Sequence, residues 1–166
     1  MTDPHLDLAA RAGVADERAL LSAFADNYRA IFRAKVAGLS EADARRSPVP
    51  TGTSIGGLLK HLRWMEQAWF QRVLAGEPNL PDRPAGEFFP TNEDTVESLL
   101  AEYDAQCEIS RRIAAAHELS DTGVHHNLGE VTLRWIYVHV IEETARHAGQ
   151  ADIIREQLDG VTGPEI

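Results

Sequence analysis

Residues 137–156 read YVHVIEETARHAGQADIIRE, and Gly149 is the only residue in them that disfavours a helix. At about 100° per residue, the apolar residues of this segment and its flanks fall within roughly 40° of one another: Ile136, Val140, Ile154 and Leu158. Glu143 and His147 lie on the same stripe, one turn apart. Because an unpaired charge on a packed face is unfavourable, we expect Glu143 to be protonated, ion-paired or bound to a metal.

Apolar residues recur at helical spacing in three further segments. These are residues 15–38, a segment from Thr53 or Ser54 to Gly76, and a segment from Thr91 or Asn92 to about His117. The last helix is expected to begin at Asn127, because Glu130 three residues later resembles a capping box, and to end near Leu158.

Two connections separate these helices. Residues 41–54 contain prolines and a glycine and are expected to form a connection. Residues 77–91 contain EPNLPDRPAGEFFP, a long proline-rich loop of the kind that is often functional or lid-like, and Phe88 and Phe89 are candidates to hold it over the core.

No strand-like alternation, internal repeat or low-complexity tract is evident. Four long amphipathic segments predict an all-α protein, a four-helix bundle of the up-down type with one longer connection. At 166 residues the chain is expected to be a single domain, residues 1–166, whose residues 1–13 form a loose arm.

The composition excludes several classes of function. A net charge of -10 argues against nucleic acid as a partner and against an anionic membrane surface, since both require a basic protein face. No apolar run is long enough to span a bilayer, and no signal peptide is evident, so a cytoplasmic protein is expected. Cys107 is the only cysteine, which excludes a multi-thiolate zinc site; its place on an apolar stripe favours a core residue over a nucleophile.

Glu143 and His147, at positions i and i+4, project from one helix face and could grip a metal ion together. His61, at the boundary of the second helix's apolar stripe, is the candidate third ligand. Such a set suits zinc as a Lewis acid, but also iron, nickel or manganese. The competing interpretation is a solvated glutamate–histidine pair of little consequence.

Three other positions could contribute to a pocket. His139 could be a fourth ligand, a residue that supports a ligand or a histidine of the bundle, and Gln150 could orient a ligand or a substrate. Trp64 could line a pocket or an interface, or be a partly covered surface residue. His125 and His126 lie in a polar loop, where we expect them to be solvated.

Three segments resemble the DinB-like superfamily, and within it the branch of mycothiol-dependent enzymes. They are TSIGGLLKHLRWMEQAWF, VTLRWIYVHVIEET and EETARHAGQADIIRE. The resemblance implies a four-helix bundle that binds a divalent metal, zinc foremost, with nickel or iron as alternatives. It makes His61 the first ligand and His147 the last. Many members have a histidine where this chain has Glu143, and the glutamate form is similar to that of mycothiol-dependent maleylpyruvate isomerase.

The resemblance also implies a transferase or isomerase that uses a low-molecular-weight thiol, such as mycothiol, on a small electrophilic substrate. The metal would bind the thiol as its thiolate, which needs no protein cysteine. Two alternatives stay open: a non-catalytic bundle that binds metal or ligand in a stress response, and a metal-dependent hydrolase. Members of the superfamily commonly form dimers, so a homodimer is expected.

Overall fold

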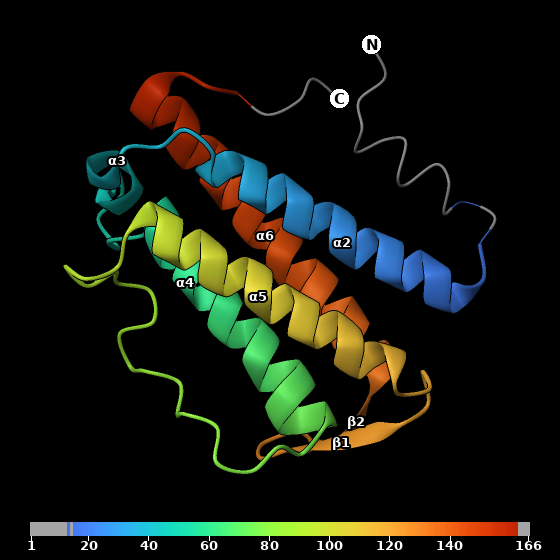
Figure 1. Cartoon of the computed structure of the whole chain (residues 1–166). Helices are drawn as coiled ribbons and strands as arrows, with labels where there is room; N and C mark the ends of the chain where they lie inside the picture. Colours follow the sequence, from blue (N-terminus) through green and yellow to red (C-terminus); the bar gives the residue numbers. More distant parts are fainter. Residues whose placement is uncertain (1–12, 14, 163–166) are drawn as a thin grey trace.

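The computed structural model describes residue 13 and residues 15–162. Four helical rods lie side by side (Figure 1): α2 (Glu17–Val36), α4 (Ile55–Glu66) continued by η1 (Gln67–Leu74), α5 (Val96–Ala115) and α6 (Leu133–Asp159). The prediction of an all-α four-helix bundle is thus confirmed. The arm expected at residues 1–13 lies, except for Gly13, outside the described residues. Among residues 15–162, every helix is too short or too polar to span a bilayer.

The hydrophobic core is built from side chains of all four rods. Helix α2 packs chiefly against α6, and α4 packs chiefly against α5. The largest fully buried apolar side chains come from all four rods: Phe32, Leu58, Leu62, Phe70, Tyr103, Leu133 and Ile136. Because α4 and α6 are both fixed by this core, side chains on their facing surfaces have well-defined positions.

Hydroxyl and carboxylate side chains set the helix starts. The Ser54 Oγ accepts a hydrogen bond from the Gly57 backbone N–H at 3.2 Å, as one of the two predicted caps requires. The expected start of the third helix at Thr91 or Asn92 is wrong. Thr95 and Ser98 form a reciprocal capping box there, so α5 begins at Val96.

The first and last connections also differ from expectation. A short helix, α3 (Glu41–Arg45), lies within residues 41–54. The expected helix start at Asn127 is wrong, because residues 122–132 form a hairpin of β1 (Thr122–His125) and β2 (Gly129–Thr132). Gly129 turns the chain at a φ of 75°, which favours glycine. Thr132 then caps α6, its hydroxyl accepting from the Trp135 N–H at 3.2 Å.

Hairpin and helix touch backbone to backbone. A Cβ on Gly123 of β1 would lie 2.0 Å from the carbonyl oxygen of Val73, so only glycine allows the strand to pack on the end of η1. The hairpin is therefore fixed against η1 rather than projecting freely.

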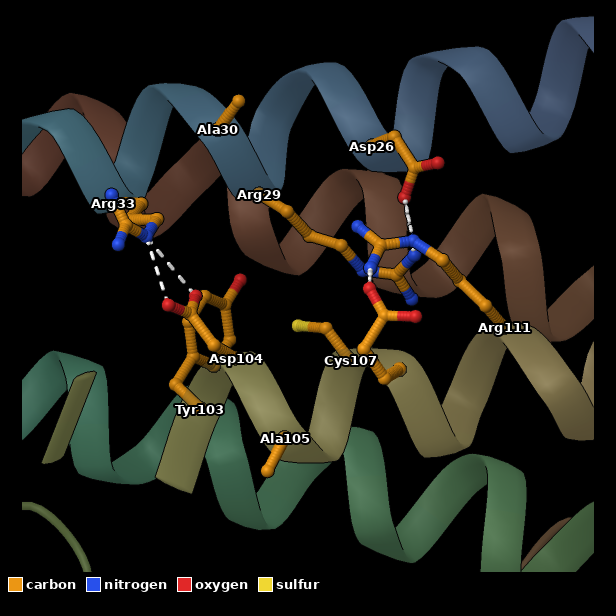
Figure 2. Close-up of a pocket in the computed structure, with 10 residues that line it drawn as sticks. Asp26, Arg29, Ala30, Arg33, Tyr103, Asp104, Ala105, Cys107 and Arg111 are labelled. Carbon is orange, nitrogen blue, oxygen red and sulfur yellow. Dashed lines mark hydrogen bonds and ion pairs between the residues drawn. The ribbon is translucent and has the colours of Figure 1, made fainter. Parts of the chain in front are cut away.

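A polar pocket of about 440 Å³ opens between α2 and α5 (Figure 2). Arg29 donates two hydrogen bonds to the fully buried Glu66 carboxylate, at 2.7 and 2.8 Å, and a third to Asp26 at 2.9 Å. Arg111 also donates to Asp26, at 2.9 Å. These charges are paired with one another. Among the described residues, no group of side chains placed to bind a metal ion lies in this pocket.

Candidate metal centre

Three potential metal ligands from two helices converge on one point inside the bundle. His61 comes from α4, and Glu143 and His147 come from successive turns of α6. The His61 Nε2 lies 3.7 Å from the Glu143 Oε2, and the His147 Nε2 lies 3.4 Å from the same oxygen. One ligand atom from each residue lies within 4.8 Å of the others. The structure thus brings together the three residues that the sequence singled out.

The outer nitrogen of each imidazole is held by a polar side chain. The His61 Nδ1 lies 2.9 Å from the Glu87 Oε1, and the His147 Nδ1 lies 2.8 Å from the Gln150 Oε1. The Gln150 oxygen favours a proton on the His147 Nδ1, which leaves the lone pair on Nε2. At His61 the anionic Glu87 carboxylate favours the same tautomer, although the Arg83 guanidinium, which can only donate, also lies 2.9 Å from that Nδ1 while it is bound to Glu87. Both Nε2 atoms are buried and have no hydrogen-bond partner among the described residues. Each ring therefore presents a lone pair toward the Glu143 carboxylate.

Glu87 was not identified from the sequence, although it lies in the predicted proline-rich loop. Its carboxylate is buried and also accepts a hydrogen bond from Arg83, at 2.6 Å. Next to it, the Phe88 ring stacks on the His61 ring, with centroids 4.1 Å apart and planes 18° apart. A carboxylate beside two phenylalanines in a loop is the only sequence signal, since an irregular segment has no periodicity that could orient it. The loop therefore covers and orients His61.

A glycine in α4 permits this close approach. A Cβ on Gly57 would lie 2.0 Å from the Phe88 carbonyl oxygen and 2.9 Å from its carbonyl carbon. Since the obstruction is backbone rather than a flexible side-chain end, no larger residue fits without moving the loop. Gly57 thereby determines how close Glu87 and Phe88 come to His61.

Burial and charge favour forms of His61 and Glu143 that suit metal binding. Burial lowers the pKa of His61, which favours the neutral imidazole. Burial acts to raise the pKa of Glu143, but the Arg146 guanidinium, with smaller contributions from the neighbouring histidines, lowers it below its usual value. Arg146 also forms an ion pair with the Glu143 Oε1, leaving Oε2 to face the two imidazoles. Near neutral pH these shifts favour the neutral imidazole of His61 and the ionised carboxylate of Glu143.

The family model for mycothiol S-transferases matches residues 20–160, which include all three candidate ligands and nearly all of the four helical rods. The chain belongs to the mycothiol S-transferase family. A crystal structure described as the conserved protein of a locus from Enterococcus faecalis is similar in fold, with a TM-score of 0.64 and 20% sequence identity over 86% of this chain and 96% of that one. No curated protein matches the chain.

Aromatic rings extend this cluster toward the hairpin. His139, one turn before Glu143, stacks on Trp135 with centroids 5.1 Å apart and meets the Trp69 ring edge-on at 4.6 Å. It also lies close enough to Glu142 and Glu143 to form a second group of potential ligands. Trp69 also stacks on His125, with ring centroids 4.9 Å apart. Of the two histidines expected to be solvated, His125 is therefore half-buried and His126 is exposed.

The remaining predicted residues take different positions. Gln150 is exposed but reaches back to the His147 ring. The Arg63 guanidinium lies over the Trp64 ring, 4.1 Å from the ring centroid. The tryptophans that contact His139 are instead Trp69 and Trp135. Cys107 is buried, and burial raises the pKa of its thiol well above the usual range. A thiolate for group transfer is therefore not available from this residue.

Proposed function

We propose that this mycothiol S-transferase family member is a divalent-metal-dependent enzyme that transfers mycothiol to a small electrophile. One observation carries the proposal: two buried imidazole Nε2 atoms without partners face a single carboxylate oxygen. Buried polar atoms in folded proteins are nearly always satisfied, so two unpartnered lone pairs beside a carboxylate call for a cation.

The spacing of the donor atoms fits a metal ion. Ligands about 2.1 Å from a tetrahedral zinc ion lie about 3.4 Å from one another, close to the 3.4 and 3.7 Å separations from the Glu143 Oε2. Two imidazoles and one carboxylate leave positions free for another molecule, as in catalytic rather than structural zinc sites. Zinc is our first assignment, and nickel or iron(II) would accept the same ligands.

Several side chains around the proposed metal have distinct parts in the reaction. A divalent metal held here would lower the pKa of a thiol that it binds, and so supply a nucleophile near neutral pH. Glu87 and Gln150 fix the tautomers of His61 and His147 through their Nδ1 atoms. The Phe88 ring covers His61 and keeps water from that side of the site. The buried Cys107 leaves the external thiol as the nucleophile.

Metal analysis tests the ligand set. We expect wild-type protein to retain about one equivalent of metal after purification and the His147→Ala variant to lose most of it, because two of three protein ligands cannot hold zinc tightly. His126→Ala is the matched control, since His126 is exposed. If wild type and His147→Ala hold equally little zinc, nickel or iron, the metal-dependent proposal is wrong.

A conjugation assay then separates the enzyme from the two alternatives. Mycothiol and 1-chloro-2,4-dinitrobenzene should react faster with the metal-loaded protein than with the chelator-treated protein, with release of chloride. A metal-loaded protein without this activity would favour a binding function. Hydrolysis of model esters without any thiol would favour a hydrolase. The expected homodimer stays a prediction that the mass from light scattering would test.

A further inference from the structure

A groove of about 680 Å³ lies beside the candidate metal centre, and none of the three candidate ligands lines it. Its walls come from three segments: Ala68, Arg72 and Val73 of η1, Asp82 and Arg83 of the proline-rich loop, and Val124 and His125 of β1 with His126 of the hairpin turn. Its volume lies within the range of about 300–1,000 Å³ that is usual for small-molecule sites.

Two chains of contacts join the groove to the metal centre. On one side Arg83 lines the groove and contacts both the Glu87 carboxylate and the His61 Nδ1, at 2.6 and 2.9 Å. On the other side the His125 ring stacks on Trp69, whose ring also contacts His139 one turn before Glu143. A molecule whose reactive end lies at the metal centre could therefore extend its remainder into the groove.

The charges in the groove are already paired. Arg72 donates to the Pro81 carbonyl oxygen at 2.8 Å and lies 3.5 Å from the Asp82 carboxylate, while Arg83 is paired with Glu87. A ligand with carboxylates of its own would find no free cation here. An uncharged ligand with many hydroxyl groups could use the same guanidinium and carboxylate groups as donors and acceptors without breaking the pairs.

Aromatic and apolar groups supply the other half of a saccharide site. The rings of His125, at the end of β1, and His126, in the hairpin turn, have centroids 4.4 Å apart and follow Val124, which is 70% exposed. Such surfaces contact the C–H faces of a sugar ring while polar groups bond its hydroxyls. Hydrogen bonds in a π-helix join residues five apart, so Ala68, Arg72 and Val73, four and five positions apart in η1, all face the groove.

We propose that this groove binds the uncharged amino-sugar–inositol part of mycothiol, and that His125 and Arg72 determine the choice of thiol. The inference rests on the proposed transferase function, and it assigns the sugar end of the thiol to a surface separate from the metal ligands. Bacillithiol, whose malate group carries two carboxylates, is expected to bind at least tenfold more weakly, because Arg72 and Arg83 are already paired.

Binding of a thiol-free probe tests the groove without the reaction. N-acetylglucosaminyl-inositol is titrated into wild type, His125→Ala, Arg72→Ala and the control Arg33→Ala, with a chelator present, and followed by tryptophan fluorescence and calorimetry. Arg33 pairs with Asp104 on the α2–α5 side of the bundle, outside the groove (Figure 2). We expect the dissociation constant to rise about tenfold in the two groove variants and to stay unchanged in Arg33→Ala.

A second variant guards against misfolding of His125→Ala. Val124 is largely exposed, so the Val124→Trp variant should fold normally and its indole should fill the groove. It should weaken binding of the probe as strongly as His125→Ala does. In the conjugation assay, the groove variants should raise the KM for mycothiol about tenfold and leave the reaction of N-acetylcysteine, which has no sugar, unchanged.

The outcomes separate the two proposals. If metal-dependent conjugation occurs but the groove variants bind the probe and mycothiol as wild type does, the groove assignment is wrong and the transferase proposal stands. If the groove variants lose the probe but no conjugation occurs in wild type, the saccharide site stands and the transferase proposal is wrong. Equal affinity for the malate-bearing head group of bacillithiol would overturn the selectivity.

Discussion

Replacing Gly57 by alanine perturbs the metal centre without touching a ligand. The added Cβ would lie 2.0 Å from the Phe88 carbonyl oxygen, whereas ordinary contacts begin at 3.4 Å, so the loop backbone must retreat. Glu87 precedes Phe88 directly and holds the His61 Nδ1 at 2.9 Å. Even a small retreat of the loop therefore lengthens this hydrogen bond and lifts the Phe88 ring from the imidazole.

Two opposing terms set the effect on stability. Overpacking against rigid neighbours costs about 1–3 kcal/mol, and alanine in a helix gains up to about 1 kcal/mol over glycine. We expect a net loss of about 1–2 kcal/mol, which in a chain of this length lowers the Tm by roughly 3–6 °C. Loss of the hydrogen bond that orients a ligating histidine typically reduces metal affinity by about 10- to 100-fold.

Gly149→Ala is the matched control, because it makes the same chemical change two residues from His147. A Cβ on Gly149 meets nothing within 4 Å, so this variant should gain about 1 kcal/mol from helix propensity and bind zinc as wild type does. Thermal unfolding of metal-free protein and competition with a chromogenic zinc chelator measure both effects. The reasoning is refuted if Gly57→Ala matches wild type in Tm and zinc affinity.

Three further outcomes are expected. Glu66→Gln removes the buried one of the two carboxylates that pair with the Arg29 guanidinium and leaves only the part-exposed Asp26, so urea unfolding should show a loss of about 3 kcal/mol; an unchanged midpoint would contradict this. Native protein should resist iodoacetamide at about pH 8 and react only in urea, because burial raises the pKa of Cys107; rapid native labelling would argue against it. Metal-free protein should lose stability as the pH falls below about 6.5, since the folded state lowers the pKa of His61 and Glu143 and the unfolded chain binds more protons; a Tm that stays constant down to about pH 4 would exclude this.

Periodicity was sufficient to predict the rods and the ligands they carry. His61, Glu143 and His147 lie in regular helices, where position along the chain fixes the direction of each side chain, so their sequence spacing translates into a meeting point. The resemblance to a known family supplied the pairing of the two helices, which spacing within one helix does not contain.

The features missed lie where periodicity ends. Glu87 reaches His61 from an irregular loop, and its position depends on the missing Cβ of Gly57, a long-range backbone contact that no local pattern encodes. The Asn127–Glu130 spacing resembled a helix start, yet Gly129 turns the chain and the hairpin packs on η1 through Gly123. In both cases a tertiary contact prevailed over a local preference.

The proposed site has two parts, the ligands on regular helices and the groove on a loop and a hairpin. These parts differ in how many amino-acid substitutions they should tolerate. The ligands lie on α4 and α6, whose facing surfaces are fixed by buried neighbours such as Leu62 and Val140, so a shift of either helix would disturb the whole core. The groove instead takes two of its three walls from a loop and a hairpin. Apart from Arg83, which contacts His61 and Glu87, the side chains that line the groove can be substituted without touching a ligand. We therefore expect the choice of thiol to change through residues such as Val124 and His125, while the metal chemistry is retained.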